Sequence, residues 1–232
     1  MSAPSLQSLA LPTRIDLRGG DMASDVTLVG CTTDAQAVAS AREAIEVLDD
    51  SERDRLSKLS ASLVADAYLV SHVLLRQSLA EHTGRAADKL QFLRSACVSC
   101  GHPHGRPYLP GRVIEFSMSH TAGYVLIAMS RSRVGVDVEA VVSASAVADL
   151  SIALSRHELE ELNELDASER SDAITRAWVR KEAYLKATGE GLNVDPGKIN
   201  VGFSAAPRPV PGCSIADVGV PNVYRAAVAV LS

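Results

Sequence analysis

The sequence predicts an α+β chain built from two similar halves, and three observations support this fold class. Patterns typical of a strand, then helices, then a strand occur in residues 25–112 and again in residues 113–232. A loop rich in Cys, Gly, His and Pro at 95–113 separates the two runs. The 232 residues, 47% of them hydrophobic, are enough for a sizeable core. We expect residues 1–24 to be a partly ordered lead-in.

In the first half, the patterns predict one strand and three helices. The strand is expected at 25–31, and helical spacing of apolar residues predicts helices at 34–49 and 62–83. Between them, Ser51 with an acid three residues later matches the start of a further helix. Gly84 is expected to end the long helix.

In the second half, short β-branched runs separated by turn residues predict five strands, with helices between the third and the fourth. Ser155 with Glu158 is a capping-box pattern that opens an acidic helix, and Gly189 is expected to end the last helix. The strands are expected at 113–119, 123–130, 134–141, 199–203 and 223–231, and the helices at 144–154, 155–165 and 169–188.

Composition excludes several classes of function. The net charge of −5 and the single Trp, five Tyr and three Phe argue against a protein that binds nucleic acid. Apolar runs are too short to cross a membrane, and no basic signal region precedes Arg14, so we expect a cytoplasmic protein. Cys31, Cys97, Cys100 and Cys213 are then expected to be reduced.

The segment GVDVEA at 135–140 places two carboxylates side by side. Because side chains of a strand alternate, Asp137 and Glu139 share one face, while Val136 and Val138 point with Ala140 to the other, core-facing side. Adjacent carboxylates repel each other, and a divalent cation with oxygen ligands, Mg²⁺ or Mn²⁺, relieves the repulsion. The alternative is a solvated edge strand.

Two further segments add polar groups of the same kind. On a helix, Trp178, Glu182 and Lys186 follow one another at intervals of four and share a face. The alternative is an ordinary surface pair of Glu and Lys. In FSMSH at 116–120, His120 ends a predicted strand and could donate to a phosphate, or simply hydrogen-bond within a turn.

Four motifs in this order resemble the surfactin-type 4′-phosphopantetheinyl transferases, with a similarity that covers about residues 50–230. The resemblance implies two α+β halves related by a pseudo-two-fold axis, with the nucleotide side of coenzyme A on the first half. It also implies transfer of the phosphopantetheine arm of coenzyme A to a serine of an apo acyl or peptidyl carrier protein, releasing 3′,5′-ADP. The motifs are GRPYLP at 105–110, FSMSH at 116–120, GVDVE at 135–139 and WVRKEAYLKATGEGL at 178–192.

The resemblance also implies roles for residues of the second half. Asp137, Glu139 and Glu182 would hold Mg²⁺, with Mn²⁺ possible, and Lys186 would contact the phosphates. Glu182 is the first choice as general base, directly or through water, and Glu139 is the alternative. Two further groups follow: Ser119 and His120 match a phosphate-contacting pair, and Gly105, Arg106 and Pro107 match an adenine-side loop in which lysine often replaces Arg106.

Contacts to the 3′-phosphate are expected from the first half. Arg53 and Arg55, with Lys58 as a weaker choice, lie where the family carries cations; the alternative is a solvated helix face. An arginine common before the position of Tyr68 is here Ala67, so one nucleotide contact is either missing or supplied by another group, such as Arg76.

The resemblance implies a small acidic helical bundle as the carrier and a monomeric enzyme. We therefore expect a docking patch that includes Arg131 and Arg133, with the acidic helix 158–166 facing away. Two other functions use the same residues: a Mg²⁺-dependent phosphohydrolase or nuclease, and a non-catalytic module that binds carrier proteins.

Cys97 and Cys100, with His102 and His104, form a second candidate site. Four ligands within eight residues are too close together to surround one zinc ion tetrahedrally. The sequence therefore favours a plain loop over a zinc site or a redox-active cysteine pair.

Overall fold

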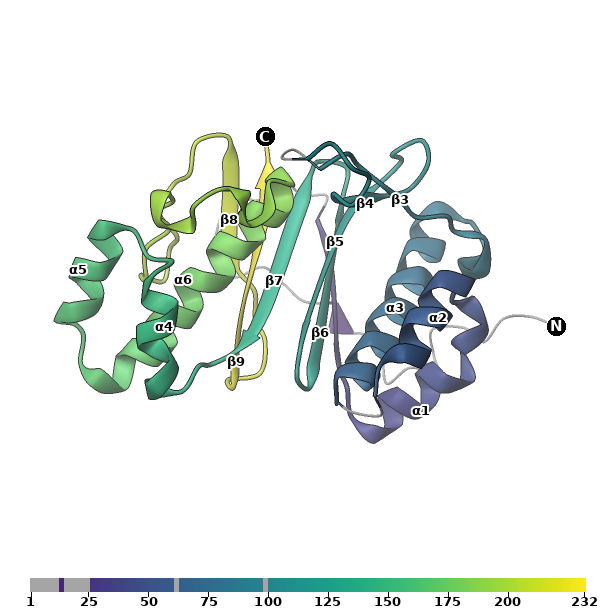
Figure 1. Ribbon diagram of the computed structural model, residues 1–232, viewed down its shortest axis with the longest axis horizontal. Helices are drawn as coiled ribbons and strands as arrows, with labels where there is room; N and C mark the ends of the chain where they lie inside the picture. Colours follow the sequence, from purple (N-terminus) through teal and green to yellow (C-terminus); the bar gives the residue numbers. More distant parts are fainter. Residues whose placement is uncertain (1–12, 15–25, 61–62, 98–99) are drawn as a thin grey trace.

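The structure, a computed structural model, contains two antiparallel sheets packed face to face, with helices covering the outer face of each (Figure 1). It describes residues 13–14, 26–60, 63–97 and 100–232. The expected lead-in at 1–24 therefore lies outside the described residues, apart from Thr13 and Arg14. The mixed α+β class is confirmed.

The first sheet has the strand order β1-β2-β6-β5, and three helices pack on it. Val29, Ile127 and Met129 of this sheet share a core with Val73 and Leu74 of the long helix. The strands are β1 (Thr13–Arg14), β2 (Thr27–Thr32), β5 (Glu115–Thr121) and β6 (Tyr124–Ser130), and the helices are α1 (Ala35–Glu43), α2 (Asp50–Lys58) and α3 (Leu63–Thr83).

The second sheet has the order β7-β9-β8 and is covered by the longest helix, α6. A two-stranded hairpin, β3 (Leu93–Arg94) with β4 (Pro107–Tyr108), lies between the two helical layers (Figure 1). The strands are β7 (Val134–Ala140), β8 (Cys213–Asp217) and β9 (Tyr224–Leu231), and the helices are α4 (Val147–Ser151), α5 (Arg156–Glu164) and α6 (Ala167–Thr188).

Alternation along β7 divides its side chains as the sequence predicts. Val136 and Val138 are fully buried between the two sheets, together with Leu126 of β6. Asp137 and Glu139 face the opposite way, toward α6. Burial of the valine face fixes the register, because a slip of one residue would turn the carboxylates into the core.

Side-chain caps mark the start of helices α2 and α5, and the cap of α2 is not the residue that the sequence predicts. Helix α2 begins after Asp49, whose carboxylate accepts from the Glu52 amide while Glu52 caps Asp49 in return. Ser51 is already inside the helix, because Asp49 and Glu52 form the reciprocal capping box that starts it. The predicted capping box of Ser155 and the stop at Gly189, with φ 77°, are both confirmed.

The stretch 199–203 is not the strand that its apolar pattern predicts. The amides of Val201 and Gly202 donate to the buried carboxylate of Glu158, and the Val201 carbonyl accepts from Arg208. These bonds replace a strand ladder. Strand β8 takes the place at the edge of the sheet and was not predicted, and the helix expected at 144–154 is reduced to a short 3₁₀ turn and α4.

The sheet pairing also shows which strands belong together. Strands β5 and β6 follow the loop at 95–113 and belong to the first sheet, where β6 pairs with β2 and β5 pairs with β6. The chain therefore passes from one sheet to the other between β6 and β7. None of the described helices is both long and apolar enough to cross a membrane.

Candidate active site

A cavity of about 360 Å³ opens where the end of β5, strand β7 and helix α6 meet. All the residues of the second half that are expected to bind the metal or the phosphates contribute to its walls. The lining residues are Met118, Ser119, His120, Asp137, Glu139, Trp178, Glu182 and Lys186. Lining residues are two apart on the strand and four apart on the helix, so each set shares one face of its element. The two faces meet at the cavity.

Gly135 allows β7 and α6 to approach closely enough to form this cavity. A Cβ atom at this position would lie 2.0 Å from the Ala183 carbonyl oxygen and 2.4 Å from the Ala187 nitrogen. Both are backbone atoms of α6, so a larger residue would push the helix away. The close approach sets Glu182 and Lys186 opposite the carboxylates of β7.

Asp137 is the most buried member of the cluster, with a residue exposure of 2%. Its Oδ1 accepts from the Ser119 hydroxyl at 2.7 Å and from the Lys186 ammonium at 2.6 Å. Its Oδ2 is buried and accepts no hydrogen bond from any residue that the structure describes. A buried carboxylate oxygen without a donor is costly, and a cation would satisfy it.

The other two carboxylates carry raised pKa values. Burial raises the pKa of Glu182 above its usual value, and the charge of Asp137 raises it further, while Lys186 lowers it. Burial and then the charge of Asp137 raise the pKa of Glu139, against smaller lowering effects of Thr121 and Lys186. The carboxylates therefore repel each other across the cavity, and a bound divalent ion would reverse this effect.

These carboxylates fit a divalent cation in chemistry and burial, but their arrangement is open. Three carboxylates, one with an unpartnered buried oxygen, are the oxygen ligands that Mg²⁺ and Mn²⁺ prefer. Asp137, Glu139 and Glu182 do not bring one oxygen each to within 4.8 Å of one another. Oδ1 of Asp137 is ion-paired with Lys186. Binding an ion to all three requires side-chain rotation.

His120 lines the same cavity. Partial burial lowers the pKa of its imidazole, and the proximity of His72 and Lys186 lowers it further. The ring is therefore held toward its neutral form, although its side chain is exposed. Ser119 lies on the inner side and is committed to Asp137.

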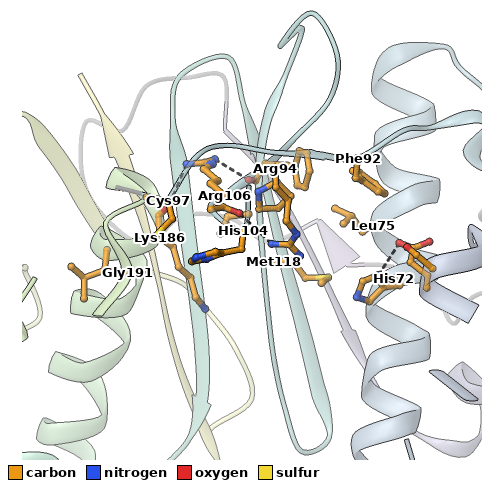
Figure 2. Close-up of a pocket in the computed structure, with 18 of the residues that line it drawn as sticks. His72, Leu75, Phe92, Arg94, Cys97, His104, Arg106, Met118, Lys186 and Gly191 are labelled. Atoms are coloured by element: carbon orange, nitrogen blue, oxygen red, sulfur yellow. Dashed lines mark hydrogen bonds and ion pairs between the residues drawn. The ribbon is translucent and has the colours of Figure 1, made fainter. Parts of the chain in front are cut away.

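A second, larger cavity of about 770 Å³ adjoins the first and shares Met118 and Lys186 with it (Figure 2). Its walls come from α2 and α3 on one side, from β5 and the hairpin loop, and from the end of α6 on the other. The lining includes the predicted residues Arg55, Gly105, Arg106 and Pro107. An elongated ligand could thus extend from the carboxylates into the space between the two helical layers.

Arg106 borders this cavity, but its guanidinium is engaged with the protein. One nitrogen donates to the carbonyls of Lys186 and Ala187 at 3.3 and 3.1 Å, and the other donates to the Phe116 carbonyl at 2.8 Å. An arginine at a helix C-terminus satisfies carbonyls that the helix leaves open. Arg106 therefore fixes the last turn of α6, which carries Lys186, against β5.

The other predicted cations of the first half lie in different surroundings. Arg53 donates to the Leu48 carbonyl and pairs with Asp50, outside the lining of both cavities. Lys58 is exposed and pairs with Asp54. Arg55 alone of the three faces the larger cavity.

Arg76 does not reach this cavity. Its guanidinium is fully buried, where it binds Asp49 and Glu52 and donates to the carbonyls of Ala87 and Leu90. It therefore holds α2 against α3 and does not supply the nucleotide contact that an arginine at position 67 would make.

His72 is a lining residue that the sequence analysis missed. Its ring stacks on Tyr68 with centroids 4.0 Å apart, and Nδ1 lies 2.9 Å from Glu52. Its place four residues after Tyr68 on a helix was a usable signal, because such residues share a face. Figure 2 shows His72 on the α3 side of the cavity, opposite Lys186.

Comparison with known proteins bears on the same residues. Residues 133–217 match the model of the 4′-phosphopantetheinyl transferase superfamily. The matched span contains Asp137, Glu139, Glu182 and Lys186, which are the charged groups of the smaller cavity, and it lies entirely within the second half of the chain.

Several curated relatives are named 4′-phosphopantetheinyl transferases. The transferase HetI of Nostoc sp. is 36% identical over 95 residues, 38% of this chain and 40% of that protein. The transferase Sfp of Bacillus subtilis is 30% identical over 95 residues, 39% of this chain and 41% of that protein. The L-aminoadipate-semialdehyde dehydrogenase-phosphopantetheinyl transferase of Candida glabrata is 30% identical over 112 residues, 45% and 43% of the two chains. In such matches the chain spans about half the length of its relatives or less.

Proposed function

We propose that this protein transfers the 4′-phosphopantetheine arm of coenzyme A to a serine of an apo carrier protein. The single observation that carries the proposal is the meeting of Asp137, Glu139, Glu182 and Lys186 in one cavity that continues into a larger one. The superfamily match covers the same residues. The smaller cavity suits the pyrophosphate, and the larger one, between the two helical layers, suits the nucleotide.

In the proposed reaction, the serine oxygen bonds to the phosphorus that carries the pantetheine arm. The bond from that phosphorus to the bridging oxygen breaks, and 3′,5′-ADP leaves. A divalent ion, Mg²⁺ or Mn²⁺, held by Asp137, Glu139 and Glu182 would neutralise charge on the pyrophosphate oxygens. Lys186 faces the shared wall of the two cavities, where it would stabilise charge that develops on the leaving phosphate.

Glu182 is the residue that we propose as general base for the serine proton. Its raised pKa brings the carboxylate closer to the range in which a base works near neutral pH. Glu139, whose pKa is also raised, is the alternative. Ser119 and His120 would contact the phosphates, and Arg55 with the hairpin loop would border the nucleotide. Arg53, which lies outside both cavities, would need a different rotamer to contribute.

The carrier protein is expected to approach over the turn between the two sheets, where Arg131 and Arg133 lie. Arg133 is exposed and donates to the Thr188 carbonyl at the end of α6. An acidic carrier would be attracted to this pair. Reversing both charges should weaken carrier binding while leaving coenzyme A binding unchanged, and unchanged carrier affinity would rule out this patch.

The deciding experiment is incubation of the chain with coenzyme A, Mg²⁺ and an apo carrier, followed by intact-mass measurement of the carrier. The carrier should gain the mass of one phosphopantetheine group, and 3′,5′-ADP should appear in equal amount. A carrier whose acceptor serine is alanine should gain nothing. Release of 3′,5′-ADP without any carrier would instead indicate a hydrolase, and tight carrier binding without turnover would indicate a binding module.

A further inference from the structure

The loop that joins β3 to β4 gathers three metal-binding side chains that the site above does not use. One ligand atom from each of Cys97, Cys100 and His104 lies within 4.8 Å of the other two. Cys100 Sγ and His104 Nε2 are 2.9 Å apart. Among the residues that the structure describes, no other group of His, Cys, Asp and Glu meets the same distance criterion.

The backbone of this loop holds the three residues together. The Cys97 amide donates to the His102 carbonyl, and the Gly101 amide donates to the Cys97 carbonyl, both at 2.8 Å. Gly101 has φ 75°, a left-handed conformation that glycine adopts without strain. The chain therefore turns sharply directly after Cys100 and brings His104 back toward the cysteines.

The two ends of the loop are also in close contact. The Gly105 amide donates to the Ser95 carbonyl at 2.9 Å, and the Ser95 amide donates to Arg106 at 3.0 Å. A Cβ atom on Gly105 would lie 2.8 Å from the Ser95 oxygen, so only glycine allows this approach. The loop is therefore closed by its own backbone, and the side chains inside it are arranged before any ligand binds.

We propose that Cys97, Cys100 and His104 bind one Zn²⁺ ion, with water in the fourth position. Two thiolates and an imidazole are the ligands that Zn²⁺ prefers. In a tetrahedral site with Zn–S near 2.3 Å and Zn–N near 2.0–2.1 Å, neighbouring ligand atoms lie about 3.5 Å apart. The observed cluster reaches that spacing after small side-chain rotations, because the ion replaces the contact between Cys100 and His104.

A site with three protein ligands is compatible with the close spacing of these residues in the sequence. Four ligands within eight residues argue against a closed tetrahedral site, and the His102 imidazole is indeed outside the cluster. That argument does not apply to three protein ligands with water as the fourth, because the turn at Gly101 places His104 beside the cysteines. Cys100 and His104 are exposed and Cys97 is half-buried, so the ion can enter from solvent.

The position of the site indicates what the ion does. Cys97 and His104 line the larger cavity beside Arg106 (Figure 2). Arg106, two residues after His104, holds the last turn of α6 against β5. A Zn²⁺ ion that crosslinks the loop would therefore stabilise the rim of the cavity and the base of this arginine, without taking part in the chemistry at Asp137.

Metal content of the purified full chain tests the proposal without any activity measurement. The protein, kept in a thiol-free phosphine reductant and supplied with Zn²⁺, should retain about one equivalent after dialysis. Titration with Co²⁺ should give the near-ultraviolet absorption of thiolate-to-cobalt charge transfer. Cys100→Ser and His104→Ala should each weaken Zn²⁺ binding about tenfold or more, measured by competition with a chromophoric chelator.

Cys213→Ala is the matched control, because Cys213 is buried in β8 of the second sheet. It should leave Zn²⁺ affinity and the cobalt spectrum unchanged. Zn²⁺ retention that survives Cys100→Ser would overturn the proposal, as would wild-type protein that binds no Zn²⁺ under these conditions. A disulfide between Cys97 and Cys100 that persists in the reductant would overturn it as well.

Discussion

The ammonium of Lys186 lies 2.6 Å from Oδ1 of Asp137, and the Ser119 hydroxyl donates to the same oxygen. The second oxygen, Oδ2, is buried and receives no donor from the described residues. Asp137 therefore has one oxygen that anchors the lysine and one that is available to a cation. In the proposed reaction, this division would let a single carboxylate both hold the cation and position Lys186 for the phosphates.

Asp137→Asn is expected to remove divalent-cation binding and to lower the transfer rate about 100-fold or more. The amide keeps the shape of the side chain and can still accept from Ser119, but it lacks the charge that holds a cation. Lys186 is partly exposed, so it can turn to solvent and the fold should persist. Transfer rate, Mn²⁺ binding and Tm are the measurements. Asp149→Asn, at an exposed position on α4, is the control, and a near-normal rate for Asp137→Asn would refute the ligand role.

Lys186→Ala is expected to lower kcat about 10²–10³-fold, as loss of a group that stabilises developing charge does. The Michaelis constant for coenzyme A should change less, because in the proposed reaction the lysine would act mainly on the leaving phosphate. Lys198→Ala, at an exposed site after α6, is the control. A loss confined to the Michaelis constant would mean that Lys186 only binds the ground state.

The part of this site that the sequence predicts is the part governed by local periods. Asp137 and Glu139 are two residues apart on a strand, and Glu182 and Lys186 are four apart on a helix, so their faces follow from geometry. The four motifs in order then indicate that the two faces meet. The structure places all four of these residues in one cavity.

Other features depend on partners distant in the chain and have no local signal. Arg106 binds carbonyls of α6 that lie 80 and 81 residues away, so no motif indicates its role in fixing the helix. The absence of the expected strand at 199–203 has a similar cause. Two backbone amides of this stretch donate to Glu158, which lies 43 and 44 residues earlier in the chain. Such side-chain bonds to the backbone compete with a strand ladder in ways that hydrophobic pattern does not show.

Glu182→Gln is expected to stabilise the metal-free protein at neutral pH. The folded-state pKa of this carboxyl is raised by burial and by Asp137, so folding favours its protonated form. The stability that the protonated carboxyl contributes is therefore fully present below the pKa of the unfolded state. It is lost as the pH rises through the pKa of the folded state. At neutral pH the ionised carboxylate costs stability, and the neutral amide removes that cost.

Tm measured in a metal chelator at about pH 4 and about pH 7.5 checks this expectation. The gain from Glu182→Gln should be present at the higher pH and small at the lower pH, where the wild-type carboxyl is largely protonated. Glu164→Gln, at an exposed position at the end of α5, should show no such dependence. A gain of equal size at both values would mean that charge is not the cause.

Gly135→Ala is expected to destabilise the fold by about 1–3 kcal/mol or more and to lower transfer without removing any polar group. The added methyl would lie 2.0 Å from a backbone oxygen of α6 and cannot be accommodated by a side-chain rotation. The helix must shift, and Lys186 must then move relative to Asp137. Tm, denaturant unfolding and kcat measure the two effects. Ala140→Val, at the exposed end of β7, adds bulk to the same strand without this clash, so it should change neither quantity. Unchanged stability and rate in Gly135→Ala would show that the close approach of β7 and α6 does not set the geometry of the site.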